Sequence, residues 1–145
     1  MNSSDSSRLE TILVVEDAEP IRKMICSMLS FSGYHCLEAA DGVEALAIVK
    51  ESLDSLDLLL TDILMPEMGG TELARHVATL RPNLPIVFMS GYTDDPVART
   101  LERSSALFLP KPFTATALNE KVRTALERPW KGVPDGVRTS SGSAQ

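Results

Sequence analysis

The chain alternates short apolar runs with segments in which apolar residues recur every three or four positions. Most of the runs are rich in β-branched and aliphatic residues without polar alternation, which is typical of strands buried on both faces of a parallel sheet. Strands are predicted at residues 11–15, 34–39, 57–61, 85–89 and 106–109. The run at 34–39 is less apolar than the others and is expected at an edge of the sheet.

The segments between the runs have the spacing of amphipathic helices. Helices are predicted at residues 20–31, 70–80 and 95–103. Two more are predicted to begin after the N-cap residues Asp41 and Thr114. The first helix is expected to bury Ile21, Met24, Ile25, Met28 and Leu29. The helix after Asp41 is expected to bury Val43, Leu46, Ala47 and Val49. Strands that alternate with helices imply right-handed crossovers and an α/β fold, with helices on both faces of one parallel sheet.

One domain suits the length of 145 residues. The periodic part of the chain runs from 9 to 128, so the domain is placed there. A polar, Ser-rich arm precedes it at 1–8, and a Gly, Ser and Pro-rich tail follows it at 129–145. Neither flank carries a periodic apolar pattern, and both are predicted to be disordered.

Composition narrows the classes of function. The net charge of −6 argues against a nucleic-acid-binding protein, because phosphate backbones require a basic face. No apolar run is long enough to span a membrane and no secretion signal is visible, so a cytoplasmic protein is expected. Cys26 and Cys36 lack metal-binding spacing and are interpreted as reduced thiols, with a disulfide between them as the alternative.

Polar residues gather where the predicted strands end. Glu16 and Asp17 follow the first strand, and Asp62 ends the third. Ser90 follows the fourth strand, and Lys111 lies between two prolines just after the fifth. Because the functional crevice of an open α/β sheet lies outside the carboxyl ends of its strands, these side chains are expected to converge.

Three carboxylates brought together would repel one another and raise at least one pKa unless a cation balances them. Mg²⁺ prefers oxygen ligands and suits two carboxylates with a carbonyl, with Mn²⁺ as a substitute. Lys111 would balance the charge on another side. A carboxylate can be the nucleophile in phosphoryl transfer, which otherwise requires alignment and charge compensation. The crevice is therefore suited to accept a phosphoryl group on one of its acids.

Four segments resemble the motifs of receiver domains, the response regulator modules of two-component signalling. They are ILVVEDAEP, LLLTDILMPEMGG, PIVFMSGY and LFLPKPF, and they occur in the order of the family between about residues 9 and 127. The runs FMSGYTDDP and FLPKPF look like the receivers of hybrid sensor histidine kinases. The resemblance implies a flavodoxin-like (βα)5 three-layer sandwich with a five-stranded sheet of order 2-1-3-4-5.

The resemblance also assigns roles around the metal and the acceptor. Asp62 matches the phosphoacceptor, Asp17 a direct Mg²⁺ ligand, and Glu16 the acid that holds the metal through water. Leu64 would give its backbone carbonyl to the metal. The side chains of Leu64 and Tyr92 match positions that tune water attack on the phosphoryl group, and slow self-dephosphorylation is expected from residues of this kind.

A second group of positions matches the residues that sense the phosphoryl group. Ser90 matches the switch hydroxyl, Gly91 the small residue beside it, and Lys111 the lysine that pairs with the phosphate. The peptide bond between Lys111 and Pro112 is expected to be cis. Phe108 matches an aromatic that swings inward when Ser90 moves, which would carry the change to the face of helix four, strand five and helix five.

Plainer roles remain open for these residues. Asp62 could be a turn residue, and Glu16 with Asp17 could cap the first helix. Ser90 could be a loop hydroxyl and Lys111 a solvated lysine. For each of these residues, its place at a strand end favours the functional interpretation. Phe108 is different, because a strand aromatic is as often part of the core.

These observations predict a phosphoacceptor that takes a phosphoryl group onto Asp62 with Mg²⁺. The donor would be the phosphohistidine of a histidine kinase or a histidine phosphotransfer protein. Catalysis is expected only of the domain's own phosphorylation and dephosphorylation. We also expect a downstream protein target of unknown identity and a homodimer that depends on phosphorylation. We expect neither a nucleic acid nor a membrane as a partner.

Three alternatives belong to other classes. A receiver-shaped interaction module that works without phosphorylation is disfavoured by the complete set of acids, hydroxyl and lysine. A phosphohydrolase of the haloacid-dehalogenase type is disfavoured because Leu64 stands where such enzymes usually place a second acid. A dinucleotide-binding enzyme is disfavoured because the loop VEDAEP has no glycine that would let a pyrophosphate approach.

Overall fold

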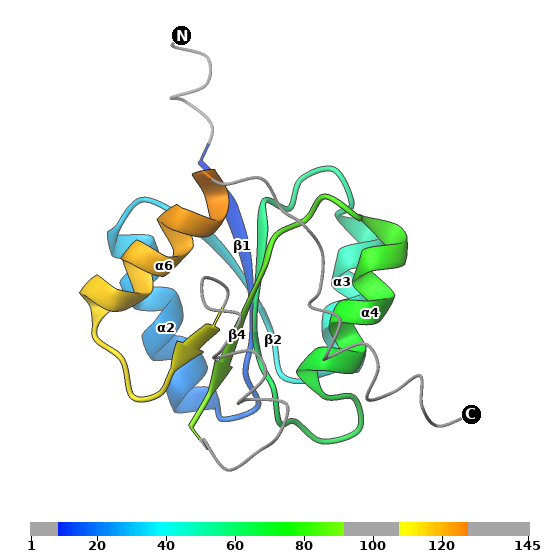
Figure 1. Cartoon of the computed structure of the whole chain (residues 1–145), viewed down its shortest axis with the longest axis horizontal. Helices are drawn as coiled ribbons and strands as arrows, with labels where there is room; N and C mark the ends of the chain where they lie inside the picture. The colour runs from blue at the N-terminus through cyan, green and yellow to red at the C-terminus, as the bar shows by residue number, and fades with distance from the viewer. Residues whose placement is uncertain (1–8, 92–107, 128–145) are drawn as a thin grey trace, which may run out of the picture.

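A parallel sheet of five strands forms the middle layer of the domain (Figure 1). The computed structural model describes residues 9–91 and 108–127. The strands are β1 (Thr11–Val15), β2 (His35–Ala39), β3 (Leu58–Asp62), β4 (Ile86–Ser90) and β5 (Phe108–Pro110). Their order is β2-β1-β3-β4-β5, and each neighbouring pair is parallel. The predicted α/β class, the strand order and the edge position of the second strand are confirmed.

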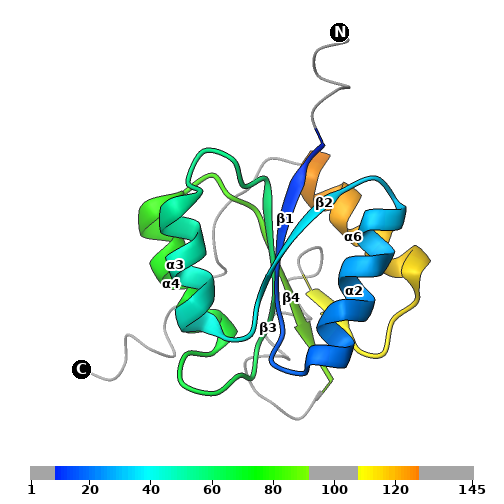
Figure 2. The same ribbon diagram turned by 180° about the vertical axis from the view of Figure 1, so that it is seen from behind.

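Helices cover both faces of the sheet and complete a three-layer sandwich (Figures 1 and 2). On one face lie α2 (Glu19–Phe31) and α6 (Ala115–Glu127). On the other lie α3 (Gly42–Glu51) and α4 (Gly70–Leu80). The helix predicted at 95–103 and the disorder predicted at 1–8 and 129–145 lie outside the described residues.

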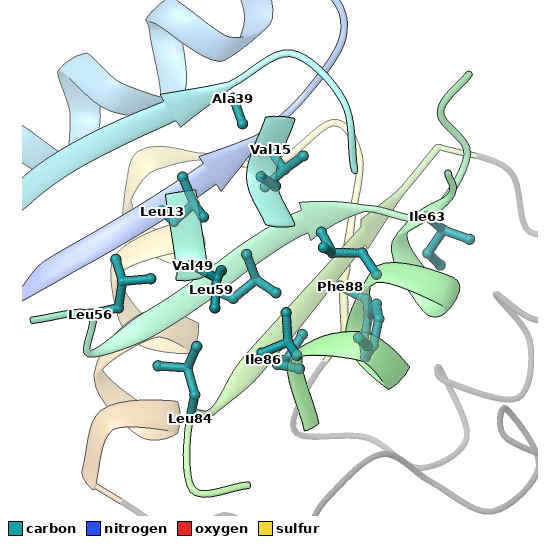
Figure 3. Packing of buried hydrophobic residues seen from close by; sticks show 14 of the residues in the cluster. Leu13, Val15, Ala39, Val49, Leu56, Leu59, Ile63, Leu84, Ile86 and Phe88 are labelled. Carbon is teal, nitrogen blue, oxygen red and sulfur yellow. The ribbon is translucent and has the colours of Figure 1, made fainter. Parts of the chain in front are cut away.

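Side chains alternate between two apolar layers along each strand. On β1, Ile12 and Val14 pack against α2 and α6, whereas Leu13 and Val15 pack against α3 and α4. Figure 3 shows the second layer, which brings together Leu13, Val15, Ala39, Val49, Leu56, Leu59, Ile63, Leu84, Ile86 and Phe88. Because both faces of the sheet are covered, the strands need no polar alternation, as their sequences indicated.

Two helices bury different residues from those that the spacing predicted. Met24 is 47% exposed and Val43 is 51% exposed, so their predicted burial is wrong, as it is for the exposed Ala47. In α2 the buried stripe is completed by Cys26 instead of Met24, and in α3 Ala45 lies inward with Val49. Since successive helical residues differ by about 100°, a small rotation of each helix on the sheet is enough to exchange these positions.

Two helix starts agree with their predicted caps. The Asp41 side chain accepts a hydrogen bond from the Glu44 N–H at 2.8 Å, and the Thr114 hydroxyl accepts one from the Ala117 N–H at 3.0 Å. Both bonds satisfy N–H groups that a helix leaves unpaired at its first turn.

The two cysteines are free thiols, so the disulfide alternative is not observed. Cys36 on β2 directs its sulfur toward the Cys26 carbonyl oxygen, 3.8 Å away.

A close backbone approach fixes the start of α4 against the end of β3. The Gly70 N–H donates to the Ile63 carbonyl oxygen at 2.8 Å. A Cβ atom on Gly70 would lie only 2.1 Å from the backbone oxygen of Asp62. The second glycine of the GG pair therefore lets the helix begin directly beside the last residue of the strand.

We predict that Gly70→Ala lowers the free energy of unfolding by at least about 3 kcal/mol, because a methyl group there collides with backbone that cannot rotate away. Helix propensity alone would give the opposite sign, since Ala is the better helix former. Gly33→Ala is the matched control. Gly33 has a φ of 99° and nothing within 4 Å of its Cβ position, so only backbone strain of about 1 kcal/mol is expected. Urea unfolding measures both; a neutral or stabilising Gly70→Ala would contradict the close approach.

Candidate functional site

The carboxyl ends of β3 and β4 and the turn after β5 line a cavity of about 420 Å³. Its lining comprises Asp62, Leu64, Ser90, Gly91, Lys111 and Pro112. Asp62 is the last residue of β3, one position later than the predicted end of the strand, and pairs in register with Met89. The cavity thus lies where the sequence placed the functional crevice.

Three acids meet at this edge of the sheet. Glu16, Asp17 and Asp62 each offer a carboxylate oxygen, and these oxygens all lie within 4.8 Å of one another. Glu16 is 1% exposed and Asp62 is 8% exposed, whereas Asp17 is exposed. The N-cap of α2 is Ala18, without a side-chain cap bond, so neither acid of the pair caps the helix in the way that the plainer role required.

Lys111 joins two of the acids. Its ammonium donates to Glu16 Oε1 at 2.6 Å and to Asp62 Oδ2 at 3.0 Å, and its side chain is 20% exposed. The Lys111 backbone N–H donates to the Ser90 carbonyl oxygen at 2.9 Å. The peptide bond to Pro112 is cis, as predicted. Lys111 is therefore anchored at both ends and is not a solvated surface lysine.

Burial and charge act against each other in this cluster. Burial raises the pKa of the Asp62 carboxyl from its ordinary 3.8 to about 6; the Lys111 ammonium opposes this rise and Glu16 adds to it. Burial also works against ionised Glu16, but the hydrogen bonds from Lys111 and the Ala18 N–H outweigh it and lower the pKa of Glu16. Burial similarly opposes the charge on Lys111, but the two carboxylates together raise its pKa. Of the two buried acids, Asp62 is thus the one whose charge is less compensated.

The donor set fits a hard divalent cation. Three carboxylates and one ammonium carry a net charge of −2 when all are ionised. Carboxylate oxygens are the ligands that Mg²⁺, Ca²⁺ and Mn²⁺ prefer. Within residues 9–91 and 108–127, this cluster has the composition and spacing of a metal site, so a metal could bind here.

The remaining predicted residues divide into two groups. Ser90, 4% exposed, and Gly91 line the cavity, as does Leu64, which is 50% exposed. Phe108 does not line it: the ring is 4% exposed and packs in the core layer under α3 and α4. Tyr92 lies outside the described residues.

Comparison with known proteins shows the family of this chain. A family model for the response regulator receiver domain matches residues 12–123, well over half of the chain. The chain belongs to the response regulator receiver family. Members of this family are signalling domains of two-component systems, and receivers of response regulators work with histidine kinases or phosphotransfer partners.

Individual relatives include receivers of hybrid kinases. The chain is 39% identical over 127 residues to the sensor kinase CckA of Brucella abortus, covering 87% of this chain and 13% of that protein. It is 32% identical over 118 residues to the transcriptional regulatory protein FixJ of Rhizobium meliloti, covering 81% of this chain and 57% of that protein. The chain therefore spans only part of the length of these relatives.

Solved structures show the same fold. The receiver domain of the hybrid histidine kinase CckA has a TM-score of 0.68 at 35% identity, covering 81% of this chain and 99% of that one. A receiver domain protein from Clostridium thermocellum has a TM-score of 0.75 at 28% identity, with coverage of 83% and 96%. Among the described residues of the receiver, no helix is sufficiently long and apolar to cross a membrane.

Two polar residues near the site were missed in the sequence. Arg22 on α2 donates to the Glu16 carbonyl oxygen and to Glu38 on β2, each at 2.9 Å. The available signals were a basic residue early in the first helix and an acid within a predicted strand. Neither indicates a partner, because the contact depends on how α2 lies over the sheet edge.

We predict that Asp62→Asn stabilises the metal-free receiver at pH 7 by about 1–3 kcal/mol. The pKa of Asp62 is higher in the folded protein, so the folded state binds more protons than the unfolded chain between about pH 4 and 6. The free energy of unfolding of the wild type therefore falls as pH rises through this window. Asparagine removes that loss, and its advantage should disappear by about pH 4.

Chemical unfolding at several pH values without divalent cations tests this prediction. Asp54→Asn, which changes an exposed acid before β3, is the control and should leave the pH slope as it is. An Asp62→Asn variant whose stability runs parallel to the wild type from pH 4 to 7 would contradict the raised pKa.

Proposed function

We propose that this receiver accepts a phosphoryl group on Asp62, in a Mg²⁺-dependent reaction, from the phosphohistidine of a histidine kinase or a histidine phosphotransfer protein. One observation carries the proposal. Asp62 is a buried carboxylate at a strand end, in contact with the Lys111 ammonium and within 4.8 Å of two further acids. A turn acid or a core residue would have no need of this arrangement.

The side chains of Glu16, Asp17 and Asp62 would hold the metal, together with the backbone carbonyl of Leu64. When bound, a Mg²⁺ ion supplies charge compensation for a transferring phosphoryl group, and Mn²⁺ would serve in its place. The cluster's net charge of −2 matches one such cation.

The protein's own groups account for the transfer. A carboxylate oxygen of Asp62 forms the bond to phosphorus as the bond from phosphorus to the donor imidazole nitrogen breaks, which gives an acyl phosphate and a neutral histidine. Lys111 lies beside Asp62 Oδ2 and balances the charge on the phosphoryl oxygens. Ser90 lines the same cavity, and its hydroxyl would bond an oxygen of the phosphoryl group. Gly91, which also lines the cavity, would leave space for that group.

The signal would leave the site through β4 and β5. Ser90 ends β4, and its carbonyl oxygen is bonded to Lys111, three residues after Phe108. Phe108 is inward in this structure, which is the position that the switch model gives to the aromatic after activation. The proposal extends to the predicted face of helix four, strand five and helix five, of which helix four, at 95–103, lies outside the described residues.

The same geometry bears on the alternatives and on the setting. Lys111, bonded to both acids, is a poor fit to a module that never carries phosphate. A phosphohydrolase would need a second acid near Asp62, and the apolar Leu64, two residues further along the chain, lines the cavity instead. We place the functional unit at 9–128 of a cytoplasmic protein, which is either a hybrid kinase that contains this receiver as a module or a separate regulator. The proposal also includes a homodimer that forms on phosphorylation.

Intact mass spectrometry after incubation with Mg²⁺ and a small phosphodonor such as acetyl phosphate tests the chemistry. We expect the wild type to gain the mass of one phosphoryl group, and Asp62→Asn or a sample with excess chelator to gain none. The Asp54→Asn variant should be labelled like the wild type, since this acid is exposed and remote. Labelling that survives Asp62→Asn would place the acceptor elsewhere.

The lifetime of the acyl phosphate gives a second test. Leu64 lines the cavity with an apolar, half-exposed side chain that cannot orient a water molecule. We predict that Leu64→Asn speeds hydrolysis roughly 10-fold, because an amide can position the attacking water. Loss of the phosphoryl mass with time gives the rates, and Leu64→Met is the apolar control. Equal lifetimes for Leu64→Asn and the wild type would remove this role.

A further inference from the structure

Arg22 connects three segments beside the acidic cluster. Its Nη1 donates to the Glu16 carbonyl oxygen at 2.9 Å, and its Nε donates to Glu38 Oε1, also at 2.9 Å. The Arg22 side chain is only 13% exposed. Lys23 holds the other carboxylate oxygen of Glu38 at 3.1 Å. One guanidinium thus ties α2, the end of β2 and the loop after β1 together; Figure 2 shows α2 beside β2.

The Glu16 backbone needs this contact. Glu16 is 1% exposed and lies just beyond the end of β1, where the regular pairing with β3 has stopped at Val15. Its N–H still donates to the Ala39 carbonyl oxygen at 3.1 Å. Its own carbonyl oxygen points to the Arg22 side chain instead of a strand partner. A buried carbonyl without a donor is costly, so Arg22 determines which way this peptide unit faces.

The orientation of that peptide unit sets where two metal-binding side chains begin. Glu16 extends its carboxylate to Lys111 and to the Ala18 N–H, and Asp17 is attached through the same peptide group. If the carbonyl turned, both side chains would leave their present places relative to Asp62. We propose that Arg22 is a positioning residue for the metal site: it holds the Glu16 carbonyl so that the carboxylates of Glu16 and Asp17 face Asp62.

This inference rests on the proposed metal-dependent function and adds a residue that touches neither metal nor phosphoryl group. An arginine suits the task because its planar fork can satisfy two acceptors in a fixed geometry, whereas a lysine offers a single ammonium. Glu38 in turn fixes the direction of the guanidinium. Partners behind the ligands commonly change metal affinity 10- to 100-fold when they are removed.

The sign of the effect separates positioning from charge. Arg22 carries a positive charge close to a cation site, so its electric field alone weakens metal binding. Neutral Arg22→Gln should therefore bind metal more tightly if charge is all that matters, and more weakly if the carbonyl must be held. Arg22→Lys keeps the charge but loses the fork, so only the positioning role predicts weaker binding for this variant.

The experiment is calorimetric titration of the chain with Mg²⁺ alone, with no phosphodonor present. We expect Arg22→Gln to raise the dissociation constant on the order of 10-fold and Arg22→Lys to raise it several-fold. Arg81→Gln is the matched control. Arg81 also holds backbone carbonyl oxygens, those of Leu53 and Leu56, but lies after α4, away from the acidic cluster. Its loss should lower stability and leave the dissociation constant within about twofold of the wild type.

Each result decides one of the two proposals. A wild type that binds no Mg²⁺ would overturn the proposed metal site, and with it this role of Arg22. Metal binding in the wild type with equal or tighter binding in Arg22→Gln would overturn the positioning role alone. If thermal unfolding shows that Arg22→Gln is not folded, Arg22→Lys decides: unchanged affinity overturns the role, and weaker affinity supports it.

Discussion

The receiver depends on one ammonium that serves two buried carboxylates. Lys111 contacts Glu16 at 2.6 Å and Asp62 at 3.0 Å, while Asp17 adds a third negative charge at the rim. One positive charge cannot neutralise this set, and the low exposure of Glu16 and Asp62 keeps water from doing so. Burial raises the pKa of Asp62, and the Glu16 carboxylate adds to this rise against the opposing effect of Lys111. A site with this residual negative charge favours a bound cation. Without one, the fold has to keep the three carboxylates close together although they repel one another.

The surrounding backbone supplies that restraint through contacts that leave little freedom. Gly70 brings the start of α4 against the Asp62 carbonyl, so the end of β3 cannot retreat toward solvent. Arg22 holds the Glu16 carbonyl from the other side, and the Lys111 N–H is fixed to the Ser90 carbonyl. Each contact joins the end of one strand to a different segment of the chain. These contacts to the backbone of the strand ends therefore keep the acids close together in spite of their mutual repulsion.

The sequence revealed the parts of this arrangement that repeat or lie at strand ends. The apolar runs predicted the sheet, and their last residues predicted Glu16, Asp62, Ser90 and Lys111 as neighbours, because parallel strands end on one edge. Contacts that depend on how a helix is rotated were not predictable in this way. Met24 and Val43 fit the helical spacing but lie outward, and the bond from Arg22 to Glu38 has no local pattern at all. The spacing of apolar residues gives the buried face of a helix to within about one position. An error of that size decides whether a single side chain is buried or exposed.

Lys111 also links the charge state of the site to the rest of the domain. Its side chain reaches the ends of β1 and β3, while its backbone follows β5 and is bonded to the end of β4. A phosphoryl group on Asp62 would compete with Glu16 for the same ammonium, and a change of partner at Nζ would act on the segment that begins at Phe108. The buried ring of Phe108 lies in the core layer with Phe88 of β4, so a shift there must be accommodated by close-packed neighbours. A rearrangement of charge at one strand end can thus become a change of packing at the edge of the sheet.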